Sequence, residues 1–439
     1  MSREEIVRKI EDFRENGITP FVSRSGRIFM AEYMVSTVIG ARRSGKSFRV
    51  MQAADEMLRS GSIKSINHIC HLDFDNPVLS KMTAEQLIGL PQIFLSITPD
   101  TTIKTPLLFI FDEIHVVKDW ELAVVELSRN PNWKVIVTGS SSKLLRTDIA
   151  TQLRGKALST MLYPLSFSEF LVFKDVDKTK FSTSNSAQIR RCFDEYLKWG
   201  SFPLIPKVDS LLKEQVLREY FDTMVLKDVI QRYNISKPRV CIELYYYLLS
   251  CVGKPVTILS AFNAIKATGE SISRAVVGDW VTYAEDSWLF FTIPVFSDSL
   301  KIQERNYKKL YSIDWALAHV NSKSWDGSHS RTLENIIYCH LIRNYHRVNY
   351  FATRQNGEVD FIVCDSSGKP VKLVQVCYDI ASPETEKREL TPLIAAAKYL
   401  GIKDLVVVTL DTEAIRMVDS LVINVVPVWK WLLDDTGTV

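Results

Sequence analysis

Short apolar runs alternate with amphipathic stretches over the first 165 residues. The runs that predict strands are residues 35–39, 66–72, 107–111, 134–138 and 157–165. Residues 48–58, directly after the first run and a glycine-containing loop, predict a helix. Because strands alternate with helices, the pattern favours a doubly wound, mostly parallel α/β sheet. Residues 1–30 predict a charged helix and a loop, with Ser2 as N-cap and Glu5 completing a capping box.

From about residue 186 helical patterns dominate and aromatic residues become frequent. Here the order is helix, strand 255–258, helix, a turn at Gly269, helix 271–285 and strand 289–293, which resembles a winged helix. Helix 271–285 carries Arg274 against Asp279 and Glu285, so its charge is wrong for strong phosphate contact. A small helical module that serves packing or partner contact is the alternative.

From about residue 330 the pattern returns to α/β. Residues 331–344 and 389–400 predict helices, and the predicted strands are residues 349–351, 358–363, 371–377 and 405–410. We therefore expect three domains, comprising residues 1–185, 186–329 and 330–439. A chain of 439 residues is long enough for two or three domains.

Composition restricts the function classes only mildly. Hydrophobic residues make up 46% and charged residues 24%, and the formal charge of +3 permits nucleic-acid binding without arguing for it. The seven cysteines are scattered singly, so neither a zinc ribbon nor a redox dithiol is indicated. The N-terminus lacks the apolar core of a signal peptide, and no run of about eighteen apolar residues occurs. We expect a cytoplasmic protein without membrane contact.

Residues 40–47, GARRSGKS, fit the phosphate-binding pattern G-x-x-x-x-G-K-[ST] completely. They lie between a predicted strand and a predicted helix, which is the context that the pattern requires. Glycines let successive N–H groups point at phosphate oxygens, and the helix adds its positive end. Lys46 should reach the β- and γ-phosphates, and the Ser47 hydroxyl should bind Mg²⁺. The predicted nucleotide-binding residues are Gly40, Ala41, Arg42, Arg43, Ser44, Gly45, Lys46 and Ser47.

A second motif supports the first. Residues 107–111 are apolar and are followed by Asp112 and Glu113, which suits a buried parallel strand ending in two carboxylates. Asp112 would hold Mg²⁺ through water, and Glu113 would orient and deprotonate the attacking water. Thr138 and Ser140 end the neighbouring strand and are candidates to sense the γ-phosphate or position water. For these two residues an ordinary helix N-cap is the alternative.

These residues resemble a known family, the archaeal and bacterial AAA+-like P-loop ATPases that carry a C-terminal nuclease-like domain of unknown function. The matching motifs run in order over most of the chain: GARRSGKS at 40–47, FDEIH at 111–115, VTGSS at 137–141, LRGK at 153–156, YPLSFSEF at 163–170, GSFP at 200–203 and EVDF at 358–361. The resemblance implies a P-loop NTPase sheet, a helical winged-helix-like module and an α/β nuclease-like domain. It also implies ATP rather than another nucleoside triphosphate.

Two positions depart from the family pattern. Family members usually have an arginine after Leu-x-Gly, where this chain has Lys156, with Arg154 two residues earlier. An arginine here would stabilise transition-state charge on the γ-phosphate of a neighbouring subunit, which would require a homo-oligomer. Lysine lacks the forked donors of arginine, so either Arg154 substitutes or hydrolysis is slow; a plain surface arginine is the alternative for Arg154. The nuclease-like fold uses a helical Glu, a strand Asp and Glu-x-Lys, and here Glu334 and Asp360 are followed by Gln375-Val376-Cys377. Because the lysine and one carboxylate are missing, we expect a scaffold that has lost cleavage.

Three functions follow as hypotheses. The first is an ATPase with Mg²⁺ that switches or remodels a duplex DNA or protein partner, with Lys46, Glu113 and Arg154 as its catalytic residues. The second is an ATP-regulated, metal-dependent DNA nuclease. The third is a DNA- or partner-binding module whose ATPase is vestigial. Glu113 beside Asp112 favours water over another phosphate acceptor, so hydrolysis is preferred to small-molecule kinase chemistry.

Overall fold

The chain folds into two compact units in this computed structural model. The structure describes residues 1–140, 153, 155–180, 182–297, 299, 303, 307–322, 327–345, 347–353 and 357–434. Unit 1 comprises Met1–Tyr163 and unit 2 comprises Pro164–Val439. The division into three domains remains a prediction. Within the described ranges, none of the helices combines the length and apolar content that crossing a membrane requires.

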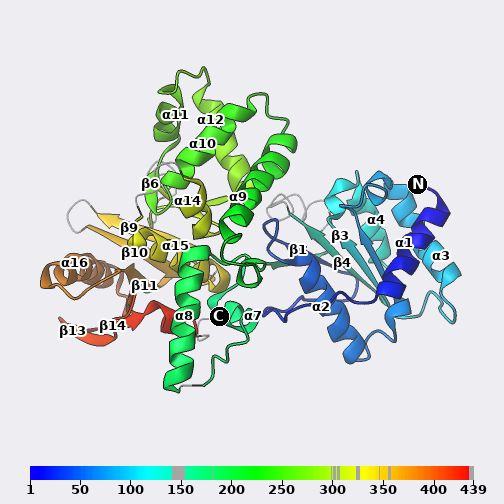
Figure 1. Cartoon of the computed structure of the whole chain (residues 1–439), viewed down its shortest axis with the longest axis horizontal. Coiled ribbons are helices and arrows are strands. Elements are labelled where there is room, and N and C mark those ends of the chain that lie inside the picture. Colours follow the sequence, from blue (N-terminus) through cyan, green and yellow to red (C-terminus); the bar gives the residue numbers. More distant parts are fainter. Residues whose placement is uncertain are drawn as a thin grey trace. The chain divides into compact units, whose positions relative to one another are not determined.

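Unit 1 is built on a parallel sheet (Figure 1). The described strands have the order β2-β3-β4-β1-β5 and all neighbours are parallel. Every residue of β1 and β3 is buried, as expected for strands covered on both faces. This confirms the predicted α/β class with a P-loop-type sheet. The strands are β1 Val35–Ile39, β2 Ile69–Asp73, β3 Leu107–Asp112, β4 Trp133–Gly139 and β5 Ala157–Met161.

Helices cover both faces of this sheet. Alternate residues of β3 point to opposite sides, so Phe109 and Phe111 join one apolar cluster with α1, α3 and α4, whereas Leu108 and Ile110 join another with α2. The predicted capping box at Ser2 and Glu5 is confirmed. The helices are α1 Arg3–Asn16, α2 Lys46–Arg59, α3 Ala84–Ile97 and α4 Trp120–Leu127, with short 3₁₀ turns η1 Ile66–His68, η2 Leu79–Lys81 and η3 Ile114–Val116.

Two predicted strands in unit 1 are shorter than expected. Residues 66–68 form a 3₁₀ turn because Ser65 bonds to His68 through both its backbone carbonyl and its hydroxyl, and only then does β2 begin. Strand β5 ends at Met161 instead of residue 165. Pro164 has no N–H to continue the ladder, and a new helix is capped by Ser166.

The first part of unit 2 is mainly helical. Its small antiparallel sheet has the order β6-β8-β7. The predicted helix 271–285 is present as α12 with Ser273 as N-cap, and the order of elements agrees with the prediction, but its winged-helix character stays a prediction. The elements are α7 Phe167–Phe173, α8 Thr183–Trp199, η4 Ile205–Lys207, α9 Lys213–Thr223, π-helix η5 Met224–Gln231, α10 Pro238–Ser250, β6 Lys254–Val256, α11 Ile258–Lys266, α12 Arg274–Asp286, β7 Phe290–Ile293 and β8 Lys308–Ser312.

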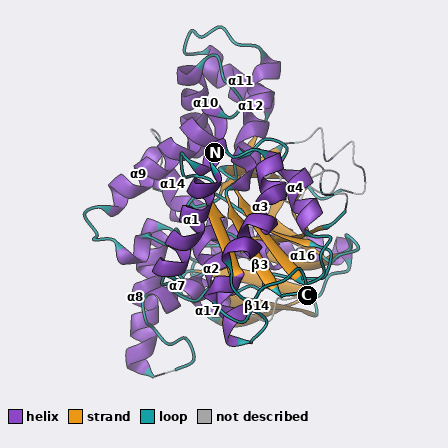
Figure 2. Cartoon of the chain, turned by 90° about the vertical axis from the view of Figure 1, so that its right-hand side faces the viewer, coloured by secondary structure: helices purple, strands orange, loops and turns teal. Residues whose placement is uncertain are grey.

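A mixed sheet with helices completes unit 2; Figure 2 labels its strand β14 and the helices α16 and α17. The described strands have the order β13-β14-β12-β11-β10-β9, with β11, β12 and β14 parallel and the other pairs antiparallel. Helix α16 begins at Pro383, six residues before the predicted start, because Ser382 caps it and proline fits the first helical position. The elements are α14 Trp315–Asn321, α15 His329–Asn344, β9 Arg347–Thr353, β10 Gly357–Cys364, β11 Pro370–Val376, α16 Pro383–Leu400, β12 Asp404–Thr409, β13 Ala414–Val418, β14 Leu421–Pro427 and α17 Val428–Trp431.

Candidate functional site

The glycine loop connects β1 to α2, as predicted. Gly45 has a φ of 97° and Arg43 a φ of 67°, so the chain makes a left-handed turn immediately before the helix. A Cβ on Gly40 would overlap the carbonyl oxygen of Leu162, so only glycine fits there. Helix α2 starts at Lys46 with no acidic residue in its first turn. The positive end of this helix therefore faces the loop without an acidic side chain from its own first turn.

Lys46 is held by the loop and by the acidic end of β3. Its Nζ donates to the carbonyls of Gly40 and Ala41, each at 3.2 Å, and lies 3.2 Å from Glu113 Oε1. The side chain is only 5% exposed, so the ammonium is in a low-dielectric environment where an anion binds strongly. Ser47, the next residue, is exposed, so a ligand in solvent can reach it.

A buried hydroxyl in the loop fits a phosphate group. Ser44 is fully buried, and its Oγ has no hydrogen-bond partner among the residues that the structure describes. Leaving a buried hydroxyl unpaired is unfavourable, and a phosphate oxygen is an acceptor that would satisfy it. Together with the glycine turns and Lys46, this orphan hydroxyl supports a phosphate site in the loop.

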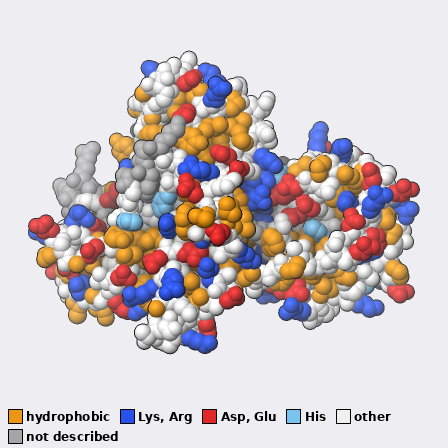
Figure 3. All heavy atoms as spheres, in the orientation of Figure 1, with side chains coloured by type: hydrophobic (Ala, Val, Ile, Leu, Met, Phe, Trp, Pro, Cys, Tyr) orange, Lys and Arg blue, Asp and Glu red, His pale blue; other side chains and the backbone are white. Residues whose placement is uncertain are grey.

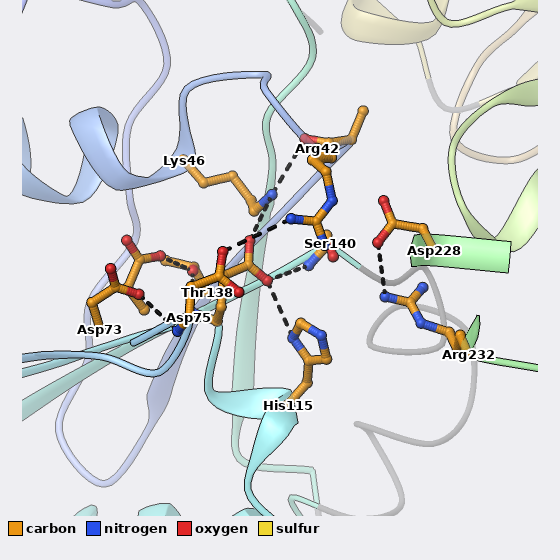
Figure 4. Close-up of polar contacts among 12 residues, drawn as sticks. Arg42, Lys46, Asp73, Asp75, His115, Thr138, Ser140, Asp228 and Arg232 are labelled. Atoms are coloured by element: carbon orange, nitrogen blue, oxygen red, sulfur yellow. Dashed lines mark hydrogen bonds and ion pairs between the residues drawn. The ribbon is translucent and has the colours of Figure 1, made fainter. Parts of the chain in front are cut away.

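The two carboxylates at the end of β3 point to different partners (Figure 4). The Thr138 hydroxyl donates to Asp112 Oδ1 and accepts from the Glu113 backbone N–H at 2.9 Å. Glu113 Oε2 accepts from the Ser140 N–H at 3.2 Å and lies 3.2 Å from His115 Nδ1. The structure thus brings the predicted Asp112, Glu113, Thr138 and Ser140 together at one edge of the sheet.

The charge of Glu113 is stabilised in spite of its burial. Burial alone would raise the pKa of the carboxyl, but Lys46 and the contact with His115 outweigh it and hold the pKa below its ordinary value. Glu113 has a φ of 52°, a left-handed conformation that is costly for a residue with a side chain. The strand end therefore holds an ionised carboxylate in a strained and defined position.

Two further carboxylates, which the sequence analysis did not single out, lie near this edge. Asp73 is in register with Asp112 on the neighbouring strand, and burial raises its pKa to about 6. Asp75 lies 3.8 Å from Arg42 of the loop and donates its N–H to Asp73 (Figure 4). Their position directly after an apolar strand was the available signal. Arg154, the predicted catalytic arginine, lies outside the described residues.

Metal binding in unit 1 would need oxygen atoms besides the protein's own. In the described part of the chain, no group of three or more His, Cys, Asp or Glu side chains is arranged to hold a metal ion. Ser47 and Asp112, the predicted Mg²⁺ ligands, are of the oxygen type that Mg²⁺ prefers. Magnesium commonly binds through one or two protein ligands, water and substrate phosphates, so the residues fit a nucleotide-borne ion.

Unit 2 gathers its predicted nuclease-like residues around a lysine that sequence reasoning missed. Lys309 Nζ on β8 lies 2.8 Å from Glu334, 2.5 Å from Glu358 and 3.0 Å from Asp360. Gln375 accepts from the Asp360 N–H at 3.2 Å and donates to Glu389 at 2.7 Å. Asp360 thus contacts Gln375 directly and is joined to Glu334 through Lys309, whereas the role of these residues as a nuclease-like site stays a prediction.

Burial and mutual repulsion shape the electrostatics of this cluster. Burial raises the pKa of Glu334 to about 7; Lys309 opposes this rise and Asp360 adds to it. Burial alone would lower the pKa of Lys309, but Tyr311 and the carboxylates hold it well above its usual value. The ammonium stands where the carboxylates converge, so its charge offsets part of their negative charge from inside the cluster.

Comparison with known proteins assigns the class of unit 1. Residues 32–171 match the family described as AAA domain, and residues 190–325 match a domain of unknown function, DUF8612. The first range contains the glycine loop, the acidic strand end and Thr138. Unit 1 therefore carries an AAA-type P-loop domain. The nuclease-like assignment of the C-terminal region remains a prediction.

A relative of similar length defines the family of the whole chain. An uncharacterized protein of Methanocaldococcus jannaschii is 31% identical over 425 residues, which cover 94% of this chain and 91% of the relative. The chain belongs to the same family as that protein. An uncharacterized protein of Haemophilus influenzae is 28% identical over 346 residues, covering 79% and 83% of the two chains. The Walker-type ATPase of Pyrococcus abyssi gives a TM-score of 0.39 at 16% identity, covering 73% of this chain and 95% of that one.

Proposed function

We propose that the protein binds ATP with Mg²⁺ at the glycine loop of unit 1 and hydrolyses it. The hydrolysis would switch the conformation of the chain or remodel a nucleic-acid or protein partner. The observation that carries the proposal is the buried contact of 3.2 Å between Lys46 and Glu113, beside a loop with an unpaired Ser44 hydroxyl. Choosing ATP over other nucleoside triphosphates rests on the AAA family match.

Each residue of the site has a role in this proposal. Lys46 and the loop N–H groups bind the phosphates, while Ser47 and Asp112 hold Mg²⁺, which neutralises phosphate charge when bound. Glu113 is ionised and acts as the general base for water, and the Thr138 hydroxyl holds the Asp112 carboxylate and the Glu113 backbone N–H. When Lys46 turns to the phosphates, Glu113 Oε1 loses its partner and becomes available to water.

The Glu113→Gln variant tests the proposal, because it keeps the shape of the side chain and removes its basicity. We expect turnover of ATP to fall by about 10² to 10⁴-fold while nucleotide affinity is retained. Turnover is measured for both proteins with and without duplex DNA, and stimulation by DNA would make nucleic acid the partner. Equal turnover in both proteins would contradict the role of Glu113. Bound ATP without turnover in either protein would instead support a nucleotide-gated binding module.

A metal-dependent nuclease in unit 2 is a second candidate, because Lys309, although distant in the sequence, lies beside the carboxylates and provides the lysine that the sequence motif lacks. The same ammonium lies between the carboxylates, where a metal would have to bind, so we favour a scaffold without cleavage. On the face seen in Figure 3, charges of both signs are interspersed, which is typical of a solvated surface. If duplex DNA stays intact with Mg²⁺ or Mn²⁺, with and without ATP, the loss of nuclease activity is confirmed. Metal-dependent cleavage would contradict it.

A further inference from the structure

A buried arginine outside the AAA family match contacts the glycine loop. Arg24 lies in the segment that precedes β1 and is only 7% exposed. Its Nη1 donates to the Ser44 carbonyl at 2.9 Å, and its Nη2 donates to the Tyr163 carbonyl, also at 2.9 Å. One guanidinium thus joins the loop to the last residue of unit 1. The planar fork of an arginine can hold two such acceptors in a fixed relative position.

Helix α2 fixes the position of Arg24. The Arg24 N–H donates to Gln52 Oε1 at 2.9 Å, and Gln52 Nε2 donates back to the Arg24 carbonyl at 3.2 Å. Gln52 lies on the helix that begins with Lys46, so the backbone of Arg24 moves with the helix that carries the phosphate-binding lysine. Its side chain is therefore placed by the same element that completes the phosphate site.

The end of unit 1 lies directly against the loop. The Leu162 N–H donates to the Ile39 carbonyl at 2.7 Å, and the Leu162 carbonyl leaves no room for a Cβ on Gly40. Residues 162–163, which we call the exit segment, therefore touch the first glycine of the loop on one side. On the other side, Arg24 connects the exit segment to Ser44, in the middle of the loop.

We infer that Arg24 is a positioning residue that couples the glycine loop to the exit segment. Phosphate binding orders the loop N–H groups and, with them, the Ser44 carbonyl. The guanidinium passes a shift of this carbonyl to Tyr163, where the chain leaves unit 1. This inference rests on the proposed nucleotide site, since the loop must change its state for anything to be transmitted.

Hydrogen exchange without nucleotide tests the connection itself. We compare wild type with Arg24→Ala and Arg24→Lys, since an ammonium lacks the fork that serves both carbonyls. Exchange at Ser44 and Leu162 should rise about tenfold in Arg24→Ala and less in Arg24→Lys, because charge-assisted hydrogen bonds are lost. Arg49→Met is the matched control: Arg49 is also buried, with 2% exposure against 7% for Arg24, and donates to the Gly26 carbonyl of the same segment. Equal effects in the control, or unchanged exchange in the Arg24 variants, would overturn the inference.

A second experiment repeats the hydrogen-exchange measurement with a non-hydrolysable ATP analogue and Mg²⁺. In wild type the analogue should slow exchange in both the loop and the exit segment, whereas in Arg24→Ala it should slow exchange in the loop alone. The KM for ATP should rise about tenfold in Arg24→Ala with kcat within about twofold, because Glu113 and Lys46 are untouched. An exit segment that responds equally in both proteins would overturn the coupling. If the wild-type loop shows no protection, the proposed function fails, and the nucleotide-free exchange alone decides whether Arg24 joins the two segments.

Discussion

Each unit buries a lysine against carboxylates, but the two lysines are held in different ways. In unit 1, Lys46 shares its ammonium among two backbone carbonyls and Glu113. In unit 2, Lys309 contacts three carboxylates, and Glu334 also accepts from the Tyr311 hydroxyl at 2.7 Å. One ammonium faces mostly neutral partners and the other faces mostly ionisable ones.

This difference in partners separates a lysine that can exchange its contacts for a ligand from a lysine whose contacts are permanent. Lys46 can turn to a phosphate because two of its partners are neutral carbonyls, and its one carboxylate partner, Glu113, keeps its contacts with Ser140 and His115. Lys309 cannot leave Glu334 and Asp360 without exposing buried carboxylates to each other. We therefore interpret the lysine of unit 1 as a ligand-binding group and that of unit 2 as an internal counter-ion.

Removing the internal counter-ion should have the largest effect. Lys309→Met should lower the free energy of unfolding by about 3–5 kcal/mol, because breaking a buried ion pair leaves its partners uncompensated. Urea denaturation at pH 8 measures the change.

Lys372→Met is the control, since Lys372 pairs at 3.3 Å with Asp404, whose side chain is 48% exposed. Such a surface pair contributes about 0–1 kcal/mol. A Lys309→Met protein as stable as the control would show that the cluster does not depend on its ammonium.

The pH dependence of unit 2 should follow Glu334. Its pKa is raised from 4.5 to about 7 by burial, so the folded state binds this proton more tightly than the unfolded state does. The resulting stabilisation is complete below about pH 4.5 and is lost as the pH rises through about 7. At about 1.4 kcal/mol per pKa unit the change is on the order of 3 kcal/mol.

The Glu334→Gln variant should flatten this slope, because an amide does not titrate. Thermal unfolding of both proteins between pH 4.5 and 8 measures it. Asp314, whose pKa burial raises to about 6, contributes in the same direction in both proteins, so the difference between them isolates Glu334. If the curves of thermal stability against pH are parallel for the two proteins, a group other than Glu334 is responsible for the titration.

Sequence alone predicted the glycine loop between β1 and α2 and the carboxylates at the end of β3, because both are local patterns. Eight contiguous residues define the loop, and the apolar run before Asp112 predicts a buried strand that delivers the carboxylates to the sheet edge. The parallel register then places Thr138 beside them. His115 also lies within this motif, two residues after Glu113, but a lone histidine gives no signal until its contact is seen.

The lysine of unit 2 and Arg24 of unit 1 could not be predicted from local patterns. Lys309 is 51 residues from Asp360 and comes from a different sheet, so only the fold makes them neighbours. Arg24 is 139 residues from Tyr163, and its acceptors are backbone carbonyls, which carry no sequence signal. Strand β13 was missed because its side chains alternate between partly and fully exposed, without an apolar run.

The smallest effect should come from the neutral group that orients the unit 1 carboxylates. Thr138→Val keeps the volume but loses the hydroxyl that links Asp112 to the Glu113 backbone. Losing these two hydrogen bonds should reduce kcat about tenfold, because Glu113 keeps its contacts with Lys46 and Ser140. Steady-state turnover measures the loss, with Thr138→Ser as a control that restores the hydroxyl. If Thr138→Ser is as slow as Thr138→Val, the methyl group matters rather than the hydrogen bonds. The carboxylates of unit 1 would then be held by packing, and the contrast with the ion-paired carboxylates of unit 2 would be greater still.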